Sequence, residues 1–157
     1  MTSTQAPSPL DLLVTCPRGL EELLAEELEA LGATPGKRTV GAVSAAGDVA
    51  TAYRLCLWSR LANRVILCLA REEGAATPEA LRLAAAALPW EQHLAEGSTL
   101  AVDFHGRSDE IRHTRFGAQT VKDGVVERLQ ARGQARPSVD IKAPDLRLYT
   151  HLHRGRL

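Results

Sequence analysis

The side chains best suited to chemistry lie in the segment 105–122, HGRSDEIRHTRFGAQTVK, ahead of and within an expected helix. Backbone N–H groups and the dipole at a helix N-terminus favour anions, and a guanidinium group binds phosphate through two parallel N–H bonds. Gln119 and Lys122 lie about one turn further along the same helix, where they could continue such a contact. The segment predicts a nucleic-acid contact through four residues at the helix start: Arg107, Arg112, His113 and Arg115.

Further cations extend this basic track towards the C-terminus. Arg136 and Lys142 are the next candidates, and Arg147 is a weaker one. In the alternative interpretation, the loop arginines only pair with Asp109 or Glu110. Both carboxylates reduce the local positive charge, and we expect them to limit non-specific binding.

The distribution of charge favours the C-terminal third as the face that meets a polyanion. The 157-residue chain has 19 Lys and Arg against 19 Asp and Glu, so its formal net charge is 0. Residues 1–75 hold seven Lys and Arg against nine Asp and Glu, whereas residues 105–157 hold eleven against six, with four of the five histidines. A polyanion would respond to this basic third rather than to the average. Uneven scatter over a solvated surface is the alternative.

No catalytic or metal-binding set accompanies the basic segment. There is no Gly-rich phosphate loop, no HExxH and no nucleophile elbow, so we expect no catalytic residue and no cofactor bound by this chain. His105, His151 and His153 could in principle hold a metal, but polar side chains on an exposed strand face are the favoured interpretation. Cys16 precedes an expected helix, where a thiolate would be stabilised, yet no partner base is evident nearby. We expect it to pack or to cap.

Composition places the chain among globular proteins that do not contact a membrane. It is 45% apolar and 24% charged, and no segment approaches the roughly 18 apolar residues of a membrane span. The start, MTSTQAPSPLD, lacks the basic and apolar parts of a secretion signal. Three widely spaced cysteines suit a reducing compartment, so we expect a cytoplasmic protein. Aromatic residues make up 4%, which argues against exposed aromatic clusters and favours backbone and shape recognition over base stacking.

The first half predicts a ferredoxin-like βαββαβ unit over residues 1–75. Apolar spacing and turn residues indicate a strand at 10–15, a helix at 19–31, a turn at Pro35-Gly36, a weak hairpin at 39–44, a helix capped by Asp48 and a central strand at 64–70. Trp58 and Leu61 are expected to be buried near the junction with the second half. The candidate inward positions of the second helix are Val49, Ala52, Tyr53, Leu55 and Cys56.

The second half, residues 76–157, alternates helices and strands, which gives an α/β (α+β) fold class overall. After a linker at 71–76, we expect a helix capped by Thr77, a strand at 99–105, a helix at 116–132 capped by Thr114 and a last strand at 145–153. Gly124 weakens the long helix by about 1 kcal/mol relative to Ala in an exposed interior. Since the last strand has no following helix, we expect the chain to be part of a longer protein. The inward stripe of the long helix is Phe116, Val121, Val125 and Leu129.

Four strings resemble one family: RGLEELLAEELEALGA at 18–33, LWSRLANRV at 57–65, IRHTRFGAQTVKDGVVERL at 111–129 and RPSVDIKAPDLRLYTHLH at 136–153. They are similar to the N-terminal part of the bacterial 23S ribosomal RNA guanine-N2 methyltransferase family, which in some bacteria is fused to a guanine-N7 methyltransferase (the K/L type). The resemblance implies a ferredoxin-like unit packed on a THUMP α/β RNA-binding domain, with the family's THUMP span beginning as early as residue 51. One departure is His113, where the resemblance leads us to expect Asn.

The resemblance implies an RNA-binding module that delivers large-subunit ribosomal RNA to a catalytic domain outside this chain. The chain has no Asn-Pro-Pro-aromatic motif, so we expect it not to be an enzyme alone, whereas the parent protein would use S-adenosylmethionine. Two alternatives stay open. One is a stand-alone interaction domain that binds protein partners through its acidic first half, and the other is a tRNA-binding module.

Overall fold

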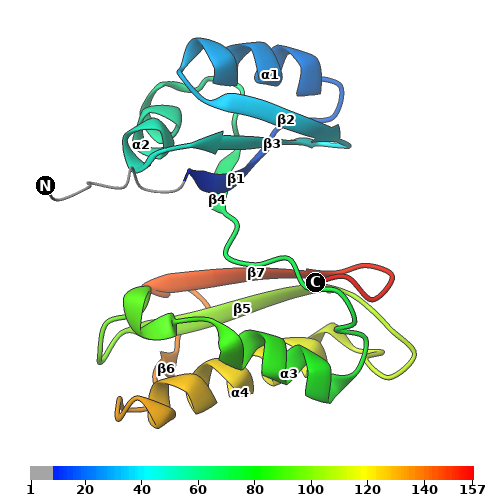
Figure 1. The fold of residues 1–157 in the computed structure, drawn as a ribbon, viewed down its shortest axis with the longest axis vertical. Helices are drawn as coiled ribbons and strands as arrows, with labels where there is room; N and C mark the ends of the chain where they lie inside the picture. Colours follow the sequence, from blue (N-terminus) through cyan, green and yellow to red (C-terminus); the bar gives the residue numbers. More distant parts are fainter. Residues whose placement is uncertain (1–8) are drawn as a thin grey trace, which may run out of the picture. The chain divides into compact units, whose positions relative to one another are not determined.

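A computed structural model of the chain describes residues 9–157, and the chain divides into two compact units after Leu69 (Figure 1). Both units combine helices with a sheet, which confirms the mixed α/β class. Residues 1–8, which include most of the segment considered above for a secretion signal, lie outside the described part.

The first unit is a four-stranded antiparallel sheet with order β2-β3-β1-β4 and two helices packed on one face. Leu24 and Leu28 of one helix and Leu55 of the other are buried against Leu12, Val14, Val43 and Ala45 of the sheet. The elements are β1 (Leu10–Thr15), α1 (Glu21–Ala30), β2 (Thr34–Thr39), β3 (Ala42–Gly47), α2 (Val49–Trp58) and β4 (Arg64–Leu67). The expected βαββαβ order is therefore confirmed.

Two expectations for this sheet are wrong. The strand at residue 64 is an edge strand rather than a central one, because β1 lies between β3 and β4. Pro35 and Gly36 lie within β2 rather than in a turn, since Pro35 pairs with Ala45 and the register shifts between Pro35 and Arg38. Such a bulge and a proline are tolerated because β2 is also an edge strand, where a missing N–H breaks no ladder.

The buried side of α2 also differs from the expectation. Asp48 caps the helix as expected, its Oδ1 accepting from the Thr51 N–H at 2.7 Å. The buried residues, however, are Thr51 and Leu55, whereas Val49, Tyr53 and Cys56 are exposed. Trp58 is 69% exposed, so the expectation of its burial is wrong, while Leu61 is half-buried against the core of the unit. Apolar residues occur all round α2, and their pattern alone does not identify the side that packs.

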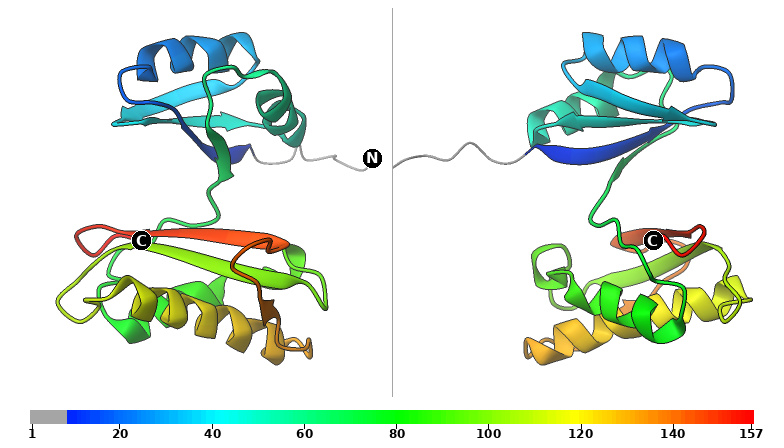
Figure 2. Two further views of the ribbon diagram at one scale, coloured as in Figure 1. Left: turned by 180° about the vertical axis from the view of Figure 1, so that it is seen from behind. Right: turned by 45° about the vertical axis from the view of Figure 1, so that its right-hand side comes forward.

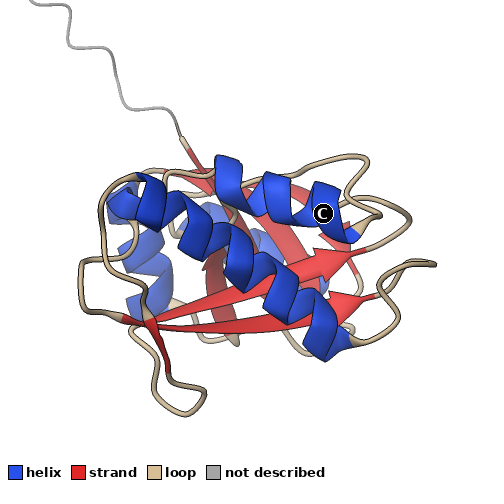
Figure 3. Cartoon of the chain, turned by 90° about the horizontal axis from the view of Figure 1, so that it is seen from below, coloured by secondary structure: helices blue, strands red, loops and turns tan. Residues whose placement is uncertain are grey.

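The second unit is a three-stranded parallel sheet with order β6-β5-β7, and two helices lie across one of its faces (Figures 2 and 3). Thr77 caps the first helix as expected, its Oγ1 accepting from the Ala80 N–H. The elements are α3 (Pro78–Ala87), the 3-10 turn η1 (Trp90–Gln92), β5 (Thr99–Gly106), α4 (Thr114–Ala131), β6 (Ser138–Val139) and β7 (Leu146–Leu152). The short β6 lies between α4 and β7, where no strand was expected.

Helix α4 departs from its expected form at three points. It begins at Thr114, so His113 is the N-cap residue and Thr114 is not, and Phe116 is exposed rather than inward. Val121, Val125 and Leu129 are buried as expected. Gly124 is also buried, and a Cβ there would lie 2.4 Å from the Arg82 carbonyl oxygen of α3. This glycine therefore permits the close approach of the two helices.

Candidate nucleic-acid interface

The loop between β5 and α4 is held rigidly at its base. Gly106 has φ +105°, and a Cβ there would lie 1.9 Å from the Leu152 carbonyl oxygen, so only glycine fits where the chain leaves the sheet. The Ser108 hydroxyl donates to the Ala76 carbonyl at 2.5 Å and accepts from the Ile111 N–H at 3.0 Å. Ile111 is fully buried. These anchors fix the backbone that carries the basic side chains.

The cations of this loop face solvent around the start of α4. Arg107, Arg112, His113 and Arg115 are all exposed, and the Arg112 Nε donates to the Asp109 carbonyl at 3.0 Å. Among the residues that the structure describes, neither Asp109 nor Glu110 forms an ion pair with these arginines. The loop arginines are therefore not neutralised in the way that the alternative interpretation required.

The N-terminus of α4 is left open to an anion. The His113 side chain makes no capping hydrogen bond, and the first turn contains no acidic residue. An uncapped helix start presents backbone N–H groups and the positive end of the dipole. Here these groups lie beside guanidinium side chains, an arrangement that suits phosphate.

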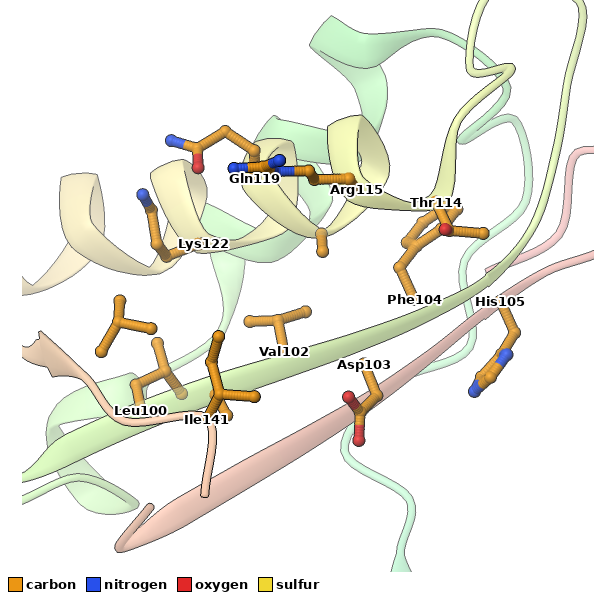
Figure 4. Close-up of a pocket in the computed structure, with 13 residues that line it drawn as sticks. Leu100, Val102, Asp103, Phe104, His105, Thr114, Arg115, Gln119, Lys122 and Ile141 are labelled. Atoms are coloured by element: carbon orange, nitrogen blue, oxygen red, sulfur yellow. The ribbon is translucent and has the colours of Figure 1, made fainter. Parts of the chain in front are cut away.

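A hollow of about 380 Å³ lies between β5 and α4, next to this helix start (Figure 4). The strand β6 pairs only with Thr99 and Leu100, so the rest of this edge of β5 is not covered by a strand within residues 9–157. Arg115, Gln119 and Lys122 line the hollow from α4, and its apolar lining includes Val102, Ala118, Val139 and Ile141. It can take a flat, partly apolar group while cations hold an attached anion.

Two polar residues of the lining, Gln119 and Lys122, interact with the neighbouring Asp123. The Lys122 Nζ lies 3.6 Å from the Asp123 carboxylate, and the Gln119 Nε2 donates to the same carboxylate at 3.1 Å. The Lys122 side chain is only 14% exposed, so its charge is held at the wall of the hollow rather than in open solvent. Asp103 and His105 project from β5 away from α4 (Figure 4).

Three of the eight expected site residues line the same hollow. Arg115, Gln119 and Lys122 share the hollow, whereas Arg107 lines a second one of about 280 Å³ with Ser108, Asp109, Glu110, Arg154 and Gly155. Lys142 is exposed and follows the lining residue Ile141, while Arg136 is exposed two residues before β6 and lines neither hollow. Arg147 is held by Asp103 at 3.1 Å and by the Ile141 carbonyl at 2.6 Å.

Val139, Ile141 and Arg154 are among the lining residues that the sequence did not single out. Val139 and Ile141 are exposed apolar residues of a polar segment, and that isolation is the one signal that could have singled them out. Arg154 lies at the C-terminal turn, with φ 51°, and no sequence pattern connects it to Arg107.

The other candidate chemistries find little support. Burial raises the pKa of the Cys16 thiol, and nearby Glu21 raises it further, so this side chain is not a thiolate at neutral pH. Residues 9–157 contain no group of three His, Cys, Asp or Glu side chains arranged to hold a metal ion. Within the same range, no helix has both the length and the apolar character needed to cross a membrane.

Comparison with known proteins yields two domain models. The model described as the RlmL ferredoxin-like domain matches residues 11–66, and the THUMP domain model matches residues 75–157. The chain is 62% identical over 149 residues to a "Ribosomal RNA large subunit methyltransferase K/L" of Chromohalobacter salexigens, and 50% identical over 145 residues to that of Pseudomonas aeruginosa. These matches cover 95% and 92% of this chain but 20% of each relative, so the chain spans about a fifth of their length.

Solved structures of methyltransferases also resemble this chain. TrmN from Thermus thermophilus aligns with a TM-score of 0.69 and 29% identity, covering 94% of this chain and 43% of that protein. A Listeria monocytogenes protein described as a "predicted N6-adenine-specific DNA methylase" aligns with a TM-score of 0.80 and 25% identity, covering 94% of this chain and 38% of that one.

Proposed function

Because the chain belongs to the THUMP domain family and carries the RlmL ferredoxin-like domain before it, we propose that it binds large-subunit ribosomal RNA for a methyltransferase. In this proposal the chain is the RNA-binding part of a 23S ribosomal RNA guanine-N2 methyltransferase. The names of its relatives, which are ribosomal RNA methyltransferases, support this substrate class. S-adenosylmethionine and the transfer of its methyl group belong to a catalytic domain outside the 157 residues.

One observation carries the proposal: exposed arginines surround an uncapped helix start that opens beside a hollow. Arg107, Arg112 and Arg115 bind phosphate oxygens, and the backbone N–H groups of the first turn of α4 add donors to the same anion. His113 contributes a polar side chain at the N-cap position. Phosphate contacts of this kind hold an RNA in one orientation without reading its sequence.

The remaining site residues extend the contact on either side. Gln119 and Lys122 hold the RNA against the wall of the hollow, while Arg136 and Lys142 continue the basic track beside β6. The module then orients the RNA, and the spacing between module and catalytic domain selects the guanine that is methylated.

The test is a salt titration of RNA binding by the isolated chain. Fluorescence anisotropy with a folded 23S ribosomal RNA fragment should give an affinity that falls steeply as salt rises, because bound phosphates release counterions. Replacing Arg112 and Arg115 together by Ala should lower the affinity and flatten the slope of log affinity against log salt by about 1 to 2 units. The free energy of unfolding should barely change, because exposed arginines contribute little to stability.

The matched control removes two arginines from the first unit, Arg18→Ala with Arg38→Ala. Arg38 makes an exposed ion pair with Glu22, so this control also loses two positive charges at little cost in stability. The proposed site is wrong if this control loses as much RNA affinity as the loop variant. The proposed function is wrong if the wild-type chain binds no RNA.

A further inference from the structure

The outer side of α2 is apolar where a surface helix is usually polar. Val49, Tyr53 and Leu57 recur every four residues, which places them on one stripe of the helix. Trp58 lies about a quarter-turn beyond Leu57, and therefore about 140° round the helix from Tyr53. Their side chains are 57%, 67%, 77% and 69% exposed. These four residues, the α2 face, carry most of the exposed apolar surface of the helix, so they lack a partner within their own unit.

Positive charges accompany the α2 face. From residue 49 to residue 70 the sequence has no Asp or Glu, yet it contains Arg54, Arg60 and Arg64, within the acidic half of the chain. Arg54 is one helical turn before Trp58, and Arg60 follows Trp58 by two residues. Arg54, whose Nη1 donates to the Leu31 carbonyl at 2.9 Å, and Arg60 therefore place two positive charges near Trp58.

The carboxylates that flank this segment are already engaged by donors of the first unit. Asp48 accepts from the Thr51 N–H, while Glu27 accepts from the Ser59 hydroxyl at 2.5 Å and the Arg60 N–H at 3.0 Å. Partial burial opposes the ionisation of Glu27, but these hydrogen bonds lower the pKa of both groups, so both stay charged; the charge of Glu27 also acts on Arg60, and that of exposed Asp48 acts on Arg54. The α2 face thus offers aromatic rings beside two cations, and the carboxylates near these cations already accept hydrogen bonds from the first unit.

We propose that the α2 face binds unpaired bases of single-stranded RNA. Tyr53 and Trp58 stack on bases, while Arg54 and Arg60 bind the phosphates between them. A polyanion with aromatic rings complements this combination in both charge and chemistry. The inference rests on the proposed RNA-binding function and adds a second contact, on the first unit, for a different form of RNA. It differs from the expectation of recognition by backbone and shape alone, since Tyr53 and Trp58 are both exposed.

The two tryptophans allow a direct measurement. Trp58 is exposed and Trp90 is 3% exposed, so a base that stacks on the protein quenches Trp58 and leaves Trp90 unaffected. A ten-nucleotide oligouridylate should quench the intrinsic fluorescence saturably, whereas a blunt RNA duplex should not. Tyr53→Ala with Trp58→Ala should weaken oligouridylate binding, measured by anisotropy, about tenfold or more and change duplex binding less than twofold. Tyr53→Phe with Trp58→Phe, which keeps both rings, should stay within about threefold of wild type.

The control replaces two exposed apolar residues of the same unit that lie outside the α2 face, Leu23→Ala with Val40→Ala. This pair should leave oligouridylate affinity unchanged. If the Tyr53 and Trp58 double variant binds oligouridylate as wild type does while Arg112→Ala with Arg115→Ala loses binding, the α2 face is not an RNA site and the proposed function stands. If wild type binds neither RNA, the proposed function itself fails. Self-association in sedimentation velocity that Leu57→Ala abolishes would instead make the α2 face a dimer contact and overturn this inference.

Discussion

Replacing Gly124 by Ala should destabilise the second unit, although the same change stabilises an exposed helix. Alanine gains about 1 kcal/mol over glycine in a helix interior. Against this gain, the new Cβ would lie 2.4 Å from the Arg82 carbonyl oxygen and 2.8 Å from the Ala85 Cβ. The nearer atom belongs to the backbone of α3, so no side-chain rotation relieves the clash and α3 must shift against α4. Overpacking of this kind costs about 1–3 kcal/mol.

The two effects leave a net loss of about 1–2 kcal/mol in the free energy of unfolding, taking the upper half of the overpacking range because backbone must move. For a domain of this size, such a loss lowers Tm by roughly 4–16 °C. The shift also separates Arg82 from Glu127, which form an ion pair between α3 and α4. Any lost contact there adds to the destabilisation.

Trp90 provides the assay, because it reports on the second unit alone. Its ring is buried and its Nε1 donates to the Ala85 carbonyl at 2.6 Å, beside the expected clash, whereas exposed Trp58 changes little on unfolding. Urea unfolding followed by Trp90 emission should give a lower midpoint for Gly124→Ala than for wild type. Gln130→Ala and Gln130→Gly, at an exposed site of α4, measure helix propensity alone. An equal or higher midpoint for Gly124→Ala would refute the packing argument.

Two further predictions concern ionisable groups. The Arg128 guanidinium donates to Glu91 and lowers the pKa of that carboxyl to about 2, so its stabilising contribution should be present above pH 4.5 and disappear as the pH falls towards 2. We therefore expect the free energies of unfolding of wild type and Glu91→Gln to differ at neutral pH and to converge in acid. A difference that stays constant with pH would contradict the pairing. Cys56 is exposed while burial raises the pKa of Cys16, so Ellman's reagent at pH 8 should label Cys56 within minutes and Cys16 only after unfolding. Because Cys68 is half-buried, the comparison is made in a Cys68→Ser background, where rapid labelling after the further change Cys56→Ser would contradict this assignment.

The parts of the fold that the sequence predicts well depend on neighbouring residues. Asp48 and Thr77 each bond to an N–H three residues ahead, so their capping follows from local sequence. The position of β4 at the sheet edge and the orientation of α2 depend on strands far away in the chain. Helix α2 is apolar on most sides, so only contact with the sheet selects Leu55 as its buried residue.

The candidate site also has features that follow from local sequence and features that depend on distant segments. Loop arginines beside a helix start are visible in sequence because a charged loop must face solvent, and Arg112 and Arg115 do so. The hollow is not visible, because it depends on where β6 stops. That strand pairs with only two residues of β5, and its continuation brings Ile141 to the rim instead of covering the edge. A longer β6 would fill the space beside Val102 and close the hollow that Lys122 lines. The hollow beside the basic loop therefore exists because β6 is short. The length of β6 depends on the pairing of segments that are distant in the chain, so no local motif predicts the hollow.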